Sequence, residues 1–161
     1  MNKINQSSMA PPPSKWDKLK SEIKAAAPSL GIDDIGFATA EPFLFLKSIL
    51  QDHRDKGYES GFEEPDLDKR TIPALESGEA MSIIAIAVAY PSKMENPPKS
   101  EPGARRGILS RASWGQDYHH VLREALGKLE NFIRDRVPDA VLESMVDTGV
   151  LVDRAVAERA G

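Results

Sequence analysis

The sequence predicts an α/β domain with a mixed central sheet flanked by helices on both faces. Residues 81–90, MSIIAIAVAY, form a nearly continuous apolar run stopped by Pro91, which is typical of a central strand covered on both faces. Segments with helical spacing of apolar residues lie before and after this run. Residues 141–161 read as a strand, a turn and a helix. Strands alternating with helices indicate the α/β class.

One domain, residues 15–161, is expected from a chain of 161 residues with 40% hydrophobic and 29% charged residues. Residues 1–14 include three consecutive prolines and no apolar run, so we expect a disordered lead-in and neither a signal peptide nor an anchor. The longest apolar run falls far short of the roughly 20 residues that span a bilayer. We therefore expect a cytoplasmic protein with no membrane partner.

The first helix is predicted to begin after Ser14, a suitable N-cap, and to stop at Gly31. Its apolar positions recur at helical spacing: Trp16, Leu19, Ile23, Ala27 and Leu30. Residues 32–38 predict a short strand. A second helix is predicted to follow Pro42 and to end at Gly57.

Two long connections follow the second helix. Residues 58–80 are rich in glycine and proline and include the acidic run 63–68, which we interpret as a solvated loop because it lacks the alternating ligands of a calcium loop. Residues 92–107 hold several prolines and no periodic pattern, so they form a second long connection. Long connections of this kind are often functional.

The local net charge changes from negative to positive where the second connection begins. Residues 41–79 hold five basic and ten acidic residues, whereas residues 93–123 hold six basic and three acidic. A basic rim of Arg105, Arg106 and Arg111 on an otherwise acidic chain suits a phosphate-bearing partner. The net charge of −4 argues against nonspecific binding of nucleic acid by the whole surface.

Aromatic residues accompany these arginines. Trp114 and Tyr118 could stack on a nucleobase or a flat macrocycle, or could belong to the core. Tyr118 begins the apolar stripe of a helix that Asp117 caps, so its spacing alone favours packing. Arg111 and Trp114, which precede that helix, are the better ligand candidates.

Asp147 is the candidate catalytic residue. It follows a predicted strand at 141–146, opens the turn 147–149 and precedes a predicted helix at 152–160. Ligands bind at such strand ends in open α/β sheets. The alternative is that Asp147 or Thr148 only closes an Asx or ST turn, and the local sequence favours that reading.

The chain has no cysteine, and its three histidines form no HExxH-type pair. It therefore has no disulfide, no cysteine nucleophile and no thiolate ligand for zinc or an iron–sulfur cluster. No metal site is predicted within the chain.

Four motifs in order resemble the epoxyqueuosine reductase family: GFEEPDLDKR, SIIAIAVAYPS, RASWGQDYHHVLREAL and SMVDTGVLVDRAVAERAG. The resemblance covers nearly all of residues 15–161. It implies an N-terminal cobalamin-binding domain of an enzyme that reduces epoxyqueuosine to queuosine in the tRNA anticodon loop, the last step of queuosine formation. It also implies two 4Fe-4S clusters, held by a Cys-rich domain, and an electron donor of the flavodoxin or ferredoxin type.

The resemblance assigns roles to individual residues. It implies that Asp147 is the proton donor and that Tyr118 and Arg154 lie at the cofactor. Because the last motif reaches the final residue and the chain has no cysteine, we expect a domain truncated at its C-terminus and inactive alone. The alternative is a non-enzymatic module that binds cobalamin or RNA.

Overall fold

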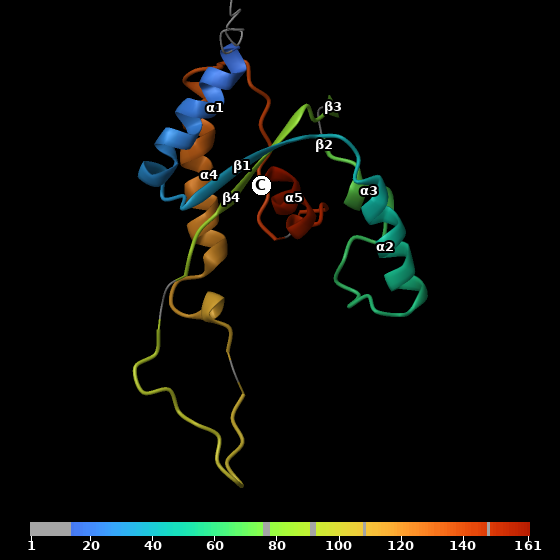
Figure 1. Cartoon of the computed structure of the whole chain (residues 1–161), viewed down its shortest axis with the longest axis vertical. Coiled ribbons are helices and arrows are strands. Elements are labelled where there is room, and N and C mark those ends of the chain that lie inside the picture. Colours follow the sequence, from blue (N-terminus) through green and yellow to red (C-terminus); the bar gives the residue numbers. More distant parts are fainter. Residues whose placement is uncertain (1–13, 76–77, 91–92, 108, 148) are drawn as a thin grey trace, which may run out of the picture.

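The computed structural model describes residues 14–75, 78–90, 93–107, 109–147 and 149–161 (Figure 1). The predicted disordered lead-in lies outside the described residues, apart from Ser14. None of the helices in the described ranges has the length and the apolar character needed to cross a membrane.

The first helix begins as predicted, but its α-helical part ends at Ala26, before the predicted stop at Gly31. Helix α1 spans Lys15–Ala26, and the Ser14 side chain accepts a hydrogen bond from the backbone N–H of Asp17 at 3.1 Å. The Asp17 carboxylate accepts the backbone N–H of Ser14 in return at 2.9 Å, which completes a capping box. The chain continues as the 3-10 helix η1, Ala27–Leu30, and stops at Gly31, whose φ of 82° favours glycine.

The central strands form an antiparallel pair. Strand β1, Asp34–Thr39, pairs with β4, Ser82–Ala87, so both predicted strands are confirmed. A second pair consists of β2, Ala74–Leu75, and β3, Gly78–Glu79. The sheets of the described residues are thus two-stranded and antiparallel, and the predicted mixed sheet is not among them. Most side chains of β4 are half-buried, not buried as a central strand would require.

A hydrophobic core joins this sheet to α1 and to α4, Tyr118–Arg134 (Figure 1). Its buried members are Ile23, Ala27, Ile32, Ile35, Ala125, Leu129 and Ile133. Asp117 caps α4 by accepting the backbone N–H of His119 at 2.9 Å. The predicted helix and its cap are confirmed.

Helix α5, Asp153–Ala160, packs on β1 and β4 and confirms the predicted last helix. The contact depends on Gly36 in β1, because a Cβ there would lie 2.5 Å from the backbone oxygen of Ala160. Arg159 fixes the last turn by hydrogen bonding to the backbone oxygen of Glu41 and by stacking 3.3 Å from the centroid of the Phe43 ring.

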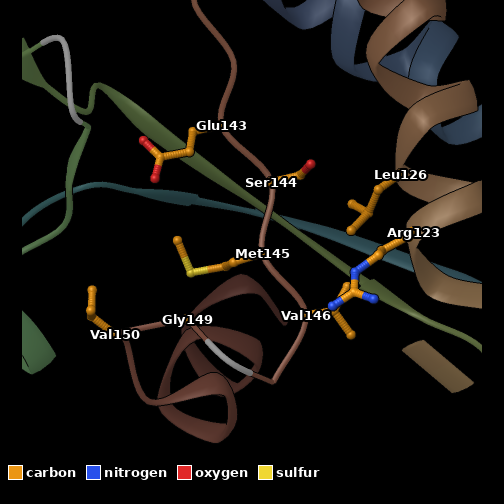
Figure 2. Close-up of a pocket in the computed structure, with 8 residues that line it drawn as sticks. All are labelled: Arg123, Leu126, Glu143, Ser144, Met145, Val146, Gly149 and Val150. Carbon is orange, nitrogen blue, oxygen red and sulfur yellow. The ribbon is translucent and has the colours of Figure 1, made fainter. Parts of the chain in front are cut away.

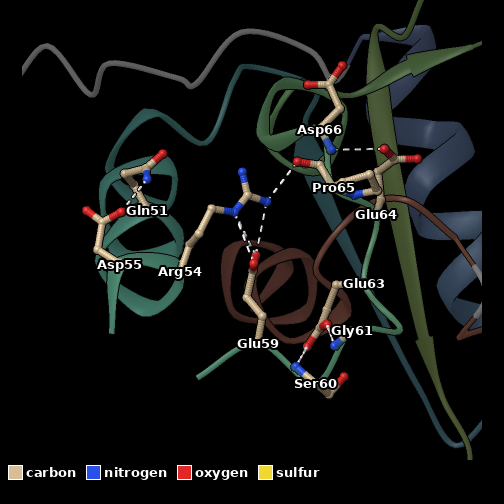
Figure 3. Close-up of polar contacts among 10 residues, drawn as sticks. All are labelled: Gln51, Arg54, Asp55, Glu59, Ser60, Gly61, Glu63, Glu64, Pro65 and Asp66. Atoms are coloured by element: carbon tan, nitrogen blue, oxygen red, sulfur yellow. Dashed lines mark hydrogen bonds and ion pairs between the residues drawn. The ribbon is translucent and has the colours of Figure 1, made fainter. Parts of the chain in front are cut away.

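The acidic loop folds around one arginine. Helix α2, Leu44–Asp55, confirms the predicted second helix, and α3, Leu67–Thr71, follows the loop. Figure 3 shows Arg54 of α2 pointing toward Glu59, and its side chain donates hydrogen bonds to Glu59 at 3.0–3.1 Å and to the Pro65 carbonyl at 2.7 Å. The Glu63 carboxylate accepts backbone N–H groups within the same loop. These acids therefore hold the loop itself.

The strand predicted at 141–146 is wrong, because these residues are irregular in the structure. The segment is tied to α4 instead: the Ser144 hydroxyl donates a hydrogen bond to Glu130 at 2.5 Å, and Leu142 packs against the core. Val146 is 8% exposed. A short apolar run satisfied by packing on a helix has the same composition as one that pairs in a sheet.

Candidate functional site

Asp147 lies in a turn within the segment that connects α4 to α5. Its φ of 57° places it in the left-handed region, which Asp adopts more readily than most residues other than glycine. The side chain is 60% exposed, although the preceding Val146 is buried. The predicted turn is confirmed at this residue, but it follows no strand. Thr148 lies outside the described residues.

Two aromatic side chains from the first turn of α4 approach the Asp147 carboxylate. The Tyr118 hydroxyl donates a hydrogen bond to Oδ2 at 2.6 Å, and His119 Nε2 lies 3.6 Å from the same oxygen. The two rings stack with their centroids 4.1 Å apart. The other His119 ring nitrogen, Nδ1, lies 2.8 Å from Asp117 Oδ1. The first turn of α4 and the turn at Asp147 thus form one polar network.

The charges in this network shift three pKa values. The hydrogen bond to Asp147 raises the pKa of Tyr118, with burial and the Asp147 charge adding to it. The hydrogen bond from the His119 backbone lowers the pKa of Asp117, helped by the His119 side chain. Burial raises the pKa of Asp153, and the nearby Asp147 charge adds to that effect.

A cavity of about 310 Å³ opens beside the segment that leads to Asp147 (Figure 2). Figure 2 shows this segment running between α4 and the turn before α5. The lining residues are Arg123, Leu126, Glu143, Ser144, Met145, Val146, Gly149 and Val150. The volume is at the lower end of the range for small-molecule sites.

Of the predicted site residues, the structure joins Tyr118 to Asp147. Tyr118 is 37% exposed, so the reading of its spacing as core packing is wrong for this residue. Arg154 lies in the first turn of α5 with an exposed side chain. Among the described residues, none of the predicted arginines forms a hydrogen bond or ion pair with Asp147.

The predicted substrate residues lie in the long connection and just after it. Arg105 and Arg106 are exposed and follow the turn at residues 102–103 of the long connection. Figure 1 shows this connection extending away from the body. Arg111 is exposed in the 3-10 helix η2, Arg111–Ser113, and Trp114 is half-buried immediately after it. These positions fit a surface that meets a partner, whose identity the geometry alone does not give.

Sequence reasoning did not identify His119, Asp117 or Asp153 as members of the site. The pattern that could have revealed His119 is an acid at the N-cap with a histidine two residues later, Asp117 and His119, because the capping carboxylate then lies beside the ring. The proximity of this pair to Asp147 depends on the fold.

The family model described as epoxyqueuosine reductase QueG, DUF1730, matches residues 70–148. An epoxyqueuosine reductase of Bacillus anthracis is 56% identical over 146 residues, which are 91% of this chain and 38% of that protein. An epoxyqueuosine reductase of Staphylococcus aureus is 56% identical over 144 residues, 89% of this chain and 38% of that protein.

Solved structures agree with these sequence matches. A selenomethionine-labelled epoxyqueuosine reductase superposes with a TM-score of 0.80 at 55% identity, covering 89% of this chain and 38% of its own. An epoxyqueuosine reductase bound to an epoxyqueuosine-modified stem loop of tyrosine tRNA superposes with a TM-score of 0.78 at 53% identity, with the same coverage. The enzyme from Bacillus subtilis, with an aspartate catalytic loop swung out of its active site, also gives 0.78 at 53% identity, covering 89% of this chain and 38% of its own.

Identity of 56% over 91% of the chain, with the same fold, relates this domain to those of epoxyqueuosine reductases. The chain belongs to the epoxyqueuosine reductase family. It spans about 38% of the length of the curated relatives named above.

Proposed function

We propose that this chain is the N-terminal part of an epoxyqueuosine reductase and that Asp147 is its proton donor. The observation that carries the assignment of Asp147 is its place in an exposed turn, held by the Tyr118 hydroxyl at 2.6 Å. A relative of 53% identity has a catalytic loop with an aspartate that can leave its active site. An aspartate on a turn with left-handed backbone suits a loop of that kind.

The proposed cofactor is cobalamin, which the family resemblance implies. A corrin ring is broader than the cavity of about 310 Å³, and neither Tyr118 nor Arg154 lines that cavity. Tyr118 and Arg154 are the residues proposed to hold the cofactor, and both side chains are exposed. When bound, cobalamin would supply electrons to the carbon that loses oxygen. The protein must then supply the protons.

Iron–sulfur clusters do not fit this chain. The 161 residues include no cysteine, so no thiolate can ligate a cluster here. In the proposed enzyme, such clusters and their flavodoxin- or ferredoxin-type electron donor would be held by other polypeptide. We accordingly predict that the chain alone does not reduce epoxyqueuosine, even with cobalamin and a chemical reductant. Turnover at the rate of a full-length relative would contradict this prediction.

The proposed substrate is tRNA, contacted by Arg105, Arg106, Arg111 and Trp114. The arginines are exposed and lie on or beside the extended connection, so phosphates can reach them without rearranging the core. Trp114 offers an aromatic face for stacking. A structure of a relative with a tRNA stem loop supports this choice of substrate.

The role of Asp147 is tested in a full-length reductase that carries these residues. We expect Asp147→Asn to abolish reduction and to leave cobalamin binding intact, because the amide keeps the shape but cannot donate a proton as an acid. Asp139→Asn is the matched control, since it removes an exposed carboxylate from a loop outside the polar network. Retention of most of kcat by Asp147→Asn would show that another group is the donor.

The binding of tRNA by these arginines is tested by salt dependence in the same full-length protein. The triple variant Arg105→Ala, Arg106→Ala, Arg111→Ala should bind the modified stem loop more weakly. Its salt slope should be smaller by about 0.7–0.9 for each phosphate that the arginines no longer neutralise. The control removes three surface positive charges that pair within their own helices: Lys18, Lys56 and Lys128. Equal effects of the two triple variants would mean that only net charge matters.

A non-enzymatic module that binds cobalamin or RNA is the second candidate, favoured by the lack of cysteine. Absorbance titration of the isolated chain with cobalamin, and affinity for the stem loop, measure both binding activities directly. Joining the chain to the remaining segment of a relative separates the candidates, since only a reductase gains turnover from that addition.

A further inference from the structure

His119 is the residue of the polar network for which the proposed function gives no role. Its Nδ1 lies 2.8 Å from Asp117 and its Nε2 lies 3.6 Å from Asp147. The second distance exceeds that of a hydrogen bond, and contacts of this kind are often long before substrate binds. The imidazole thus lies between two carboxylates and is hydrogen bonded to that of Asp117.

The stoichiometry of the proposed reaction requires more than one proton. Removing an epoxide oxygen as water and leaving a carbon–carbon double bond consumes two electrons and two protons. The electrons come from the low-valent cofactor and its iron–sulfur supply, as proposed above. One carboxyl group carries one proton, so Asp147 must be reloaded during each turnover or be assisted by a second acid.

The neighbouring groups are poor sources of that second proton, with one exception. Tyr118 holds its proton firmly, because its hydrogen bond to Asp147 raises its pKa. Asp117 has a lowered pKa and remains a carboxylate that accepts from His119. Asp153 has a raised pKa, but no hydrogen bond connects it to Asp147 in the described part of the chain. An imidazole can exchange a proton near neutral pH.

We propose that His119 reloads Asp147 with a proton from solvent, so that the one carboxyl group delivers both protons. This inference rests on the proposed function of Asp147. It makes His119 a residue that supplies protons to Asp147. Asp117 holds the ring through Nδ1–H and directs Nε2 toward Asp147. In the reload, the Nε2–H bond breaks, an O–H bond forms on Asp147, and Nε2 then takes a new proton from water.

The orientation is tested first on the chain itself. Nitrogen-15 NMR should show that neutral His119 carries its hydrogen on Nδ1, because the Asp117 carboxylate accepts it. His120, whose ring makes no hydrogen bond among the described residues, is the internal control and should favour the opposite tautomer. Asp117→Asn keeps a good N-cap and should weaken the Nδ1–H preference. A neutral His119 protonated on Nε2 would overturn the proposal.

The reload is tested by the kinetics of the full-length reductase. His119→Gln should lower kcat by at least about tenfold with little change in KM, because the variant lacks the group that reloads the acid. Asp117→Asn should lower kcat in the same sense, because the ring loses the carboxylate that orients it.

The outcomes separate this inference from the function on which it rests. An unchanged kcat in both His119→Gln and Asp117→Asn would overturn the role of His119, whereas loss of activity in Asp147→Asn would still support the proton donor. Retained activity in Asp147→Asn would overturn both. If His119→Gln does not fold, Asp117→Asn still decides the result, because Asn preserves the helix cap.

Discussion

Gly36→Ala tests how α5 is held against β1. The added Cβ would lie 2.5 Å from the Ala160 backbone oxygen and 2.8 Å from its Cβ, whereas carbon atoms in contact lie about 3.5–4.0 Å apart. Helix α5 must therefore move by about 1 Å, and its last turn cannot swing away freely because Arg159 clamps it to Glu41 and Phe43. Overpacking of this kind costs about 1–3 kcal/mol.

The matched control is Gly127→Ala in α4. A Cβ at Gly127 would meet nothing within 4 Å, and alanine is a better helix former than glycine by about 0.5–1 kcal/mol. The same chemical change should thus destabilise the protein at one glycine and stabilise it at the other. Urea unfolding followed by circular dichroism measures both, with midpoints moving in opposite directions and equal slopes.

A double variant locates the strain. Adding Arg159→Ala should reduce the cost of Gly36→Ala, because the released last turn can move away from the strand. A free energy of unfolding for Gly36→Ala within about 0.5 kcal/mol of wild type would refute the close packing of α5 on β1.

Three further changes test other parts of the fold. Ser14→Ala should destabilise α1 by about 1 kcal/mol in thermal or urea unfolding, because Asp17 loses its capping partner. Leu129→Ala should cost about 2–5 kcal/mol, since this core side chain is 3% exposed, and a smaller loss would mean that the core collapses around it. Hydrogen bonds from the Ser60 backbone lower the pKa of Glu63 from 4.5 to about 2, so the loop should keep this stabilisation above about pH 4.5 and lose it as pH falls toward 2. A carboxyl NMR titration of Glu63 with a midpoint near 4.5 would contradict that bonding.

Local signals predicted most of the helices correctly. Ser14 and Asp117 cap their helices with side-chain hydrogen bonds over two or three residues, so the sequence alone contains both partners. Gly31 stops η1 for an equally local reason, its positive φ. Local chemistry does not fix strand pairing. The antiparallel partner of β1 lies more than forty residues later in the chain, and its register depends on the core that both strands cover.

The site was predictable only where turn chemistry carries the information. Asp147 could be singled out because Asp-Thr-Gly is a turn sequence, although the strand expected before it is absent. The contact of Asp147 with Tyr118 could not be predicted, because it arises from the path of residues 141–147 along α4. The same path brings His119 to the acid. A prediction that treated this segment as a strand therefore identified the acid and missed its neighbours.

The polar network and the cysteine count together divide the proposed chemistry between two parts of an enzyme. Asp117, Tyr118, His119 and Asp147 can hold and move protons, and all lie within this chain. The proposed electron delivery through iron–sulfur clusters needs cysteine thiolates, and this chain has no cysteine. Because proton placement here depends on contacts within the chain, the tautomer of His119 and its dependence on Asp117 should be the same in the isolated chain and in a full-length protein.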